Sequence, residues 1–218
     1  MGDNIFSIEK FVKTFLNIDE TDEDITETPD IVSTRKYIDP PNRTYEISQR
    51  LQQRDSEFLA ENMLSYTELL FREIHKAVSL RELEPIRNLV SKRLYDVLED
   101  LISDEKVDAI EEYRFDSVVK KNYLTSYRVD DKYQYEYLSV CIIMNMPSSE
   151  IDYINRLTFR REVDKSARMG LPITRAICCP NCGAALDSIV STKCAYCQSL
   201  IEPAKYDWEL LDFEIIKR

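Results

Sequence analysis

The sequence contains only three glycines and one histidine among its 218 residues, and it has no apolar run long enough to span a bilayer. So little glycine, together with only eight prolines, argues against long flexible linkers. The first residues, MGDNIFSIEK, lack the basic, apolar and small-residue regions of a signal peptide. We therefore expect a cytoplasmic protein, with peripheral attachment to a membrane as the alternative.

Basic charge is also scarce, because 29 Lys and Arg residues stand against 40 Asp and Glu residues, for a net charge of -11. Binding to phosphate groups needs a basic surface, so this balance argues against a nucleic-acid partner. Hydrophobic residues make up 44% of the chain, which is enough for a core. The length predicts one domain with, at most, a small added module.

The N-terminal region shows an apolar stripe followed by an acidic run. Residues 4–18 place Ile5, Ile8, Val12 and Phe15 on one side of a predicted amphipathic helix. This helix either packs on a protein surface or lies on a membrane. Protein packing is favoured, since the segment has two lysines and no tryptophan, and residues 19–30 carry no basic group.

A connector and three helical segments follow. Residues 37–50 contain two prolines and predict an extended connector, so the folded body is expected to begin near Leu51. Helical spacing of apolar residues predicts a helix over 54–80, and Glu84 with Pro85 predicts the start of another. Ser91 is expected to cap a third helix that extends to about residue 102. His75, the only histidine, lies in a predicted helix and receives no functional role.

The hydrophobic period changes from helical spacing to alternation after about residue 110. Alternating segments near residues 115–129, 133–145, 153–163 and 211–215 predict four strands. Cys141 lies in the most apolar of these and is expected in the core. Helices followed by strands predict an α+β fold, with the helices packed on one face of an antiparallel sheet of about four strands.

Two C-x-x-C pairs lie between the third and fourth predicted strands. Cys179 with Cys182 and Cys194 with Cys197 are separated by eleven residues, a spacing that predicts a small zinc ribbon. We expect one structural zinc ion, because four thiolates leave no open position for water or substrate. A redox-active C-x-x-C is the alternative.

The residues around the first pair support this assignment. Pro180 fixes the turn between Cys179 and Cys182, and Gly183 follows at a position where a positive φ is expected. Cys178 could replace Cys179 only by lengthening the spacing and losing the proline-fixed turn. We therefore expect Cys178 to lie outside the metal site.

Five segments together resemble a bacterial protein family. They are RELEPIRNLVSKRLYDVL, NRLTFRREVD, CCPNCGAAL, KCAYCQSLI and YDWELLDFEI, and they cover roughly residues 54–216. The chain resembles bacterial Tim-forty-four-like domain proteins, which are named from a subunit of the mitochondrial inner-membrane import machinery and here carry an added zinc ribbon. One departure is Gln198, which stands where the family usually has glycine.

The resemblance implies a cone-shaped fold with a curved sheet, similar in outline to the nuclear-transport-factor-two-like fold, with an apolar pocket under the helices. In the mitochondrial relative, this domain docks partners at the membrane and contacts anionic lipid. The acidic N-terminal region of this chain has no counterpart to the basic lipid-binding segment of that relative. The expected division is an arm over 1–50, a Tim-forty-four-like domain over 51–175 with 204–218, and an inserted ribbon over 176–203.

The first functional hypothesis is a non-enzymatic module that binds or scaffolds a protein partner. The second is an enzyme or small-ligand binder that uses the cone pocket. The residues expected to point into this pocket include no acid–base pair, which argues against an enzyme. The candidate pocket residues are Phe115, Val119, Tyr123, Tyr127, Leu157 and Phe159.

The third hypothesis is nucleic-acid binding through the ribbon and a local basic cluster. The cluster comprises Arg156, Arg160, Arg161, Lys165, Arg168 and Arg175. Cross-strand pairing of Arg156 and Arg160 with Asp212 and Glu214 is expected to neutralise part of it.

Overall fold

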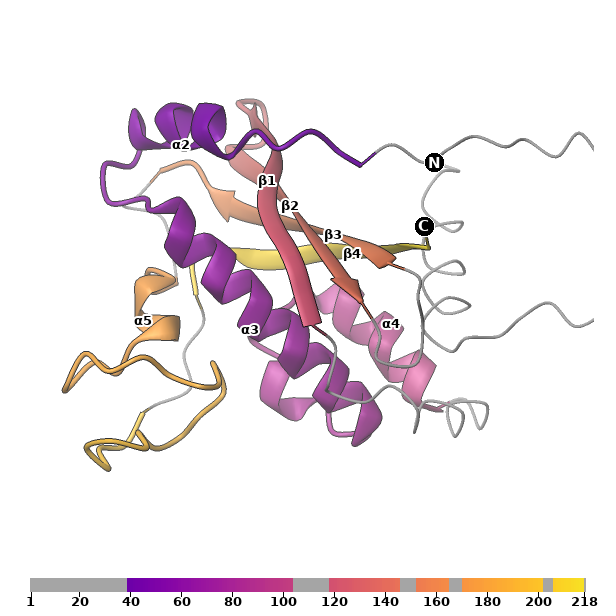
Figure 1. Cartoon of the computed structure of the whole chain (residues 1–218), viewed down its shortest axis with the longest axis vertical. Helices are drawn as coiled ribbons and strands as arrows, with labels where there is room; N and C mark the ends of the chain where they lie inside the picture. The colour runs from indigo at the N-terminus through magenta and orange to yellow at the C-terminus, as the bar shows by residue number, and fades with distance from the viewer. Residues whose placement is uncertain (1–38, 104–117, 146–151, 165–169, 202–205, 218) are drawn as a thin grey trace, which may run out of the picture.

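Helices packed against a four-stranded antiparallel sheet form the body of the protein (Figure 1). This computed structural model describes residues 39–103, 118–145, 152–164, 170–201 and 206–217. The arrangement confirms the predicted α+β fold class.

Several sequence predictions lie outside the described residues. They are the amphipathic helix at 4–18, the acidic run at 19–30, Phe115, Lys165 and Arg168.

Most of the helical structure precedes the sheet in the chain. The elements are α2 (Thr44–Gln52), α3 (Ala60–Ser79), the 3-10 turn η1 (Glu84–Ile86) and α4 (Lys92–Ser103), with a short α5 (Thr174–Ile177) after the third strand. Helix α3 buries residues at helical spacing, including Met63, Tyr66, Leu70 and Ile74. Ser91 caps α4 as predicted, because its Oγ accepts a hydrogen bond from the N–H of Leu94 at 3.2 Å.

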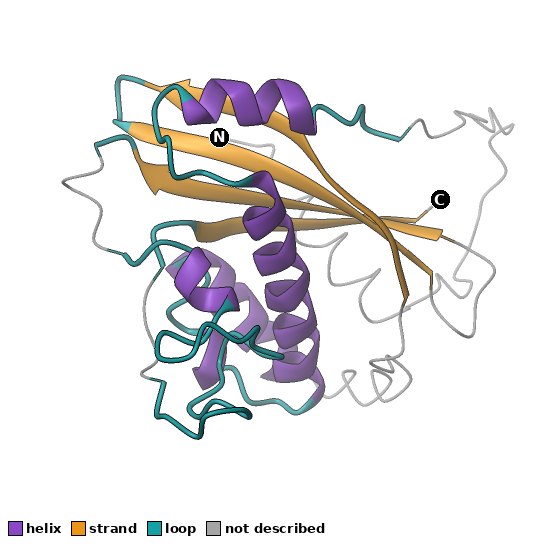
Figure 2. Cartoon of the chain, turned by 60° about the vertical axis from the view of Figure 1, so that its left-hand side comes forward, coloured by secondary structure: helices purple, strands orange, loops and turns teal. Residues whose placement is uncertain are grey.

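The strands follow one another in the sheet in the same order as in the chain. They are β1 (Val118–Asp130), β2 (Tyr135–Asn145), β3 (Asp152–Glu162) and β4 (Glu209–Lys217), and each pairs antiparallel with the next. The sheet is strongly twisted, and α3 crosses one of its faces (Figure 2). The four cysteines therefore lie in the long connection between β3 and β4.

The prediction of an extended connector was wrong for residues 44–50, which form most of α2. The two prolines precede this helix, where they do not interrupt it. The side chain of Asn42 accepts a hydrogen bond from the N–H of Thr44 at 3.0 Å. Ile47 and Leu51, four residues apart, are buried in the main core, so tertiary packing stabilises a helix that is short on its own. The folded body therefore begins before Leu51.

Two other helix predictions differ from the structure. Helix α3 begins at Ala60 rather than Arg54, because residues 55–58 form a turn in which Phe58 N–H donates to the Asp55 carbonyl. The segment that begins at Glu84 forms only the single 3-10 turn η1.

Two β-bulges in β1 change the faces of its side chains. Lys120 and Thr125 have no direct partner on β2, so the alternation of side chains shifts at each of these positions. Tyr123 consequently points to the second face of the sheet, where it packs with Cys141, Ile143 and Ile154. Leu124 takes the place expected for Tyr123 in the main core. Cys141 is fully buried, as predicted.

The pairing of β3 with β4 was predicted correctly apart from one bulge. Leu157 lies opposite Phe213, whereas Phe159 lies opposite Leu210. Leu211 is the extra residue on β4, since the partner of Thr158 is Asp212.

Candidate functional site

Four thiols converge in the connection between β3 and β4. The Sγ atoms of Cys179, Cys182, Cys194 and Cys197 all lie within 4.8 Å of one another. The Cys179–Cys197 distance is 3.7 Å, and the Cys182–Cys194 distance is 3.8 Å. Sulfurs at the corners of a tetrahedron, each about 2.3 Å from a central zinc ion, lie about 3.8 Å apart. The spacing therefore fits a metal ion, and it is far longer than the roughly 2 Å of a disulfide bond.

Two turns of the same construction hold these sulfurs. In the first, Gly183 N–H donates to the Cys179 carbonyl at 2.9 Å, and in the second Gln198 N–H donates to the Cys194 carbonyl at 3.1 Å. The N–H of each leading cysteine donates in turn to a residue five positions later, Ala184 or Ser199. Each C-x-x-C segment is thus a rigid backbone loop that presents two thiols on one side.

The residue after each C-x-x-C segment adopts a left-handed backbone conformation. Gly183 has a φ of 72°, which confirms the sequence prediction. Gln198 occupies the equivalent position with a φ of 62°, and its side-chain nitrogen donates to the Ala195 carbonyl at 2.9 Å. A non-glycine residue in this region is strained by about 1 kcal/mol. The second loop therefore keeps the geometry of the first, although its sequence departs from glycine.

Nearby donors favour a negative charge on part of the cluster. The Ser199 hydroxyl lies 3.0 Å from Cys197 Sγ, and with the Ser199 N–H it lowers the pKa of Cys197 to about 5. The N–H of Cys182 is the main cause of the lowered pKa of Cys179. At Cys182, the N–H of Ala184 lowers the pKa, but contacts with the other sulfurs and burial raise it to about 12. A bound cation would offset the repulsion between these neighbouring thiolates.

Cys178 is not a member of the four-thiol cluster, in agreement with the sequence prediction. Its backbone instead forms an antiparallel bridge with Ala185 at the base of the first loop. The equivalent bridge in the second loop joins Lys193 to Leu200. The small apolar cluster at this site adds only Leu186 and Ile201 to Cys179, Cys194 and the partly buried Cys197, so the segment has little core of its own.

The candidate pocket residues lie mostly in packed core rather than around a cavity. Tyr127, Leu157 and Phe159 are members of the main core, and Val119 is half-buried against it. Phe159 lies 6.1 Å from the ring of Tyr66, centroid to centroid. The assumption that all these residues share one face was wrong for Tyr123 because of the bulges in β1. Within the part of the chain that the structure describes, two pockets lie elsewhere, and neither is lined by Val119, Tyr123, Tyr127, Leu157 or Phe159.

The predicted basic cluster is largely paired with carboxylates. Arg156 contacts Glu214 at 3.0 Å, as expected from cross-strand pairing. Arg160 contacts Glu209 at 2.7 Å instead of Asp212, because the bulge at Leu211 shifts the register. The side chain of Arg175 is not described.

Arg161 was assigned to that surface cluster, but its side chain is only 1% exposed. It lies opposite Glu136 in the sheet, and its Nε donates to the Glu136 carboxylate at 2.8 Å. Its Nη1 donates to Asp55 at 2.8 Å and lies 3.6 Å from Asp207. The guanidinium also stacks on Trp208, 4.3 Å from the ring centroid. Sequence reasoning missed this network because its members come from four separate segments.

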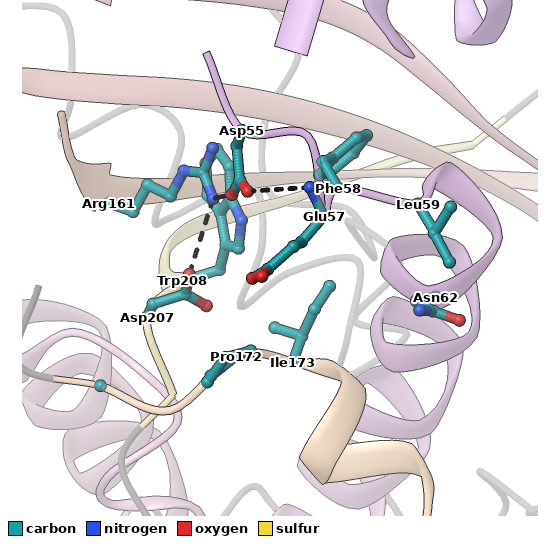
Figure 3. A pocket seen from close by; sticks show the side chains of 11 residues that line it. Asp55, Glu57, Phe58, Leu59, Asn62, Arg161, Pro172, Ile173, Asp207 and Trp208 are labelled. Carbon is teal, nitrogen blue, oxygen red and sulfur yellow. Dashed lines mark hydrogen bonds and ion pairs between the residues drawn. The ribbon is translucent and has the colours of Figure 1, made fainter. Parts of the chain in front are cut away.

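A pocket of about 450 Å³ opens beside Arg161 (Figure 3). Its walls come from three segments, which are the turn and first residues of α3, the residues before α5, and the residues before β4. The lining residues are Asp55, Glu57, Phe58, Leu59, Asn62, Arg161, Gly170, Pro172, Ile173, Asp207 and Trp208.

Comparison with known proteins assigns no family, since no protein-family model and no curated protein matches the chain. Among the residues that the structure describes, none of the helices has the length and apolar character required to cross a bilayer.

Proposed function

We propose that this protein is a non-enzymatic binding module of the Tim-forty-four-like type, and that its ribbon holds one structural zinc ion and docks a protein partner. We expect the protein to bind this partner in the cytoplasm or at a membrane surface. The observation that carries the proposal is the pair of exposed apolar side chains on the second cysteine loop. Tyr196 is 70% exposed and Leu200 is 81% exposed, although both belong to a segment with little apolar core.

The metal supports this role by holding the loop rigid. A four-thiolate set is closed to substrate, and tetrahedral sulfur coordination suits zinc or iron. We favour zinc, because two short C-x-x-C loops around one tetrahedral centre are typical of zinc ribbons. Its binding would supply on the order of 10 kcal/mol of folding free energy to a segment that cannot bury a core. Tyr196 and Leu200 are then presented on a fixed backbone, which lowers the entropy lost on binding.

Charge pairing favours a protein partner over nucleic acid. Arg156, Arg160 and Arg161 each contact a carboxylate, so they offer little uncompensated charge to a phosphate backbone. The net charge of -11 acts in the same direction.

The metal assignment is tested by elemental analysis of the purified protein and its cysteine variants. We expect one zinc per chain, loss of metal in Cys179→Ser, and full retention in the matched control Cys178→Ser. Iron in place of zinc, or loss of metal from the Cys178 variant, would contradict the assignment.

The docking role is tested by cross-linking and affinity capture from cytoplasmic and membrane fractions. Tyr196→Ser with Leu200→Ser should lose the captured partner while keeping its metal. Tyr133→Ser is the matched control, since Tyr133 is 60% exposed on the turn between β1 and β2. A partner retained by the Tyr196 and Leu200 variant, or lost equally from the control, would show that the ribbon is not the docking surface.

A further inference from the structure

The four thiols of the cluster differ in how far they are open to solvent. Cys182 is exposed, whereas Cys179 and Cys194 are only 2% and 1% exposed. The next residue, Gly183, has open space beside it, since a Cβ atom at that position would meet no atom of the described residues within 4 Å, its chain neighbours aside. A small molecule from solvent therefore reaches the sulfur of Cys182 before the two buried sulfurs.

Hydrogen bonds from side chains separate the sulfurs further. Cys197 Sγ lies 3.0 Å from the Ser199 hydroxyl and accepts a hydrogen bond from the Asn181 side chain at 3.6 Å. Cys179 Sγ lies 3.6 Å from the same hydroxyl. Donors of this kind withdraw charge from a thiolate and make it a weaker nucleophile. Among the described residues, no side-chain N–H or O–H group donates to Cys182, so its sulfur is both the most open and the least shielded.

A second thiol lies within reach of Cys182. The Sγ atoms of Cys182 and Cys194 are 3.8 Å apart, and the two cysteines belong to different loops. A disulfide bond is about 2 Å long, so a movement of about 2 Å joins these sulfurs. Such a bond removes two of the four metal ligands, and the two thiols that remain would hold an ion only weakly.

We propose that Cys182 is a site of oxidation by peroxide, and that its disulfide with Cys194 releases the metal ion and with it the docked partner. The inference rests on the proposed function, because it takes the ribbon to hold zinc and to present Tyr196 and Leu200. These two side chains belong to the second loop, on either side of Cys197. Loss of the ion removes the fixed backbone that presents them.

The reaction consumes one molecule of hydrogen peroxide for each disulfide. The Cys182 thiolate attacks one peroxide oxygen, so that an S–O bond forms, the O–O bond breaks and hydroxide leaves. The Cys194 thiolate then attacks the sulfur of this sulfenic acid, so that an S–S bond forms, the S–O bond breaks and a second hydroxide leaves. The two sulfurs together lose two electrons, and these electrons reduce the peroxide.

The test treats the purified, zinc-loaded protein with hydrogen peroxide at neutral pH. A chromophoric chelator follows the release of zinc, and mass spectrometry maps the disulfides after the free thiols are alkylated. We expect release of the zinc with a Cys182–Cys194 disulfide as the first product, and dithiothreitol with added zinc should restore the metal content. Retention of zinc in millimolar peroxide overturns the inference, as does a first disulfide that excludes Cys182.

Histidine substitutions separate the roles of the two thiols, because three cysteines with one histidine also bind zinc. Cys182→His lacks the exposed thiol and should release zinc about tenfold more slowly in peroxide. Cys194→His keeps the exposed thiol without its partner, so dimedone should trap the sulfenic acid at Cys182. The matched control is Cys178→Ser, outside the cluster, and its release rate should be unchanged. Equal release rates for the native protein and Cys182→His overturn the inference, and the disulfide mapped in the native protein decides alone if a variant loses its metal.

The two proposals fail separately. If capture of a partner depends on Tyr196 and Leu200 but the zinc and the thiols survive peroxide, only the oxidation inference is wrong. If Cys182 is oxidised and zinc is released but no partner depends on the ribbon, the docking role of the ribbon is wrong. Absence of zinc, which elemental analysis detects before peroxide is added, would contradict the metal assignment itself.

Discussion

Protonation of His75 should make the stability of this protein depend on pH between 5 and 7. His75 lies on α3 and is partly exposed, but its Nε2 atom is inaccessible to solvent, and its ring centroid lies 4.3 Å from that of Phe71 and 6.1 Å from that of Phe213. Burial, with a smaller contribution from the positive charge of Arg72, lowers the pKa of His75 from 6.5 to about 3. No other histidine exists in the chain, so no second imidazole contributes to the pH dependence.

The direction of the effect follows from proton binding. In the unfolded chain the histidine takes up a proton as the pH falls through about 6.5, whereas in the folded protein it stays neutral until about pH 3. The unfolded state therefore gains stability as the pH falls, and the free energy of unfolding decreases. With these two pKa values, His75 lowers the free energy of unfolding by roughly 1–2 kcal/mol between pH 7.5 and pH 5.5.

The assay is urea unfolding at both pH values for the native protein and for His75→Leu. This loss of unfolding free energy lowers the midpoint of urea unfolding by roughly 0.5–1 M. Carboxylates and metal-binding thiols titrate in both proteins, so the difference between the two pH dependences isolates His75. Equal pH dependence in the two proteins, or a pKa near 6.5 measured by NMR for the folded protein, would refute the reasoning.

Three further predictions concern the core, the ribbon and the N-terminal segment. Arg161→Leu removes the buried cation that contacts Asp55 and Glu136, although Arg54 still contacts Glu136, and should destabilise the protein by about 3 kcal/mol. Arg156→Leu, at a half-exposed pair, should lose less than about 1 kcal/mol, and equal losses in urea unfolding would show that the Arg161 network is unimportant. The double variant Cys194→Ser with Cys197→Ser should lose the metal and the order of the ribbon but keep the circular dichroism of the helices, and global unfolding would mean that the ribbon is part of the main core. The full chain and a variant that lacks residues 4–18 should both co-sediment only weakly with anionic vesicles. Tight binding of the full chain alone at low salt would show that this segment is a membrane anchor.

The parts of the fold that sequence could predict are those set by local periodicity. The spacing of Met63, Tyr66 and Leu70 indicated α3, and the N-cap position of Ser91 indicated α4. Helix α2 was missed because it is short and marginal alone, and only contacts with distant parts of the chain stabilise it.

The bulges in β1 and β4 were missed for a different reason. A bulge adds one residue without a clear change in composition, so strict alternation assigned Tyr123 to the wrong face and paired Arg160 with the wrong carboxylate.

The candidate metal centre could be predicted because its geometry is local. Two residues between paired cysteines set the direction of both thiols, and the loops then bring the pairs together. The Arg161 network could not be predicted in this way. It needs the register that places Glu136 opposite Arg161 and the packing that brings Asp55 across the molecule, and neither is encoded in a short segment.

The parallel bridge between Leu171 and Tyr206 bears on how this fold could gain or lose a segment during evolution. It brings the two ends of the ribbon segment side by side, so β3 and β4 could pair equally well across a much shorter loop. Closing a loop costs about 0.6 kcal/mol for each doubling of its length, so the ribbon adds only about 2 kcal/mol to the entropy cost of pairing β3 with β4. Chain length is thus not what ties the ribbon to the body: Ala176 and Ile189 of this segment are buried in the main core, so the segment could be lost only if other side chains covered the surface that it leaves.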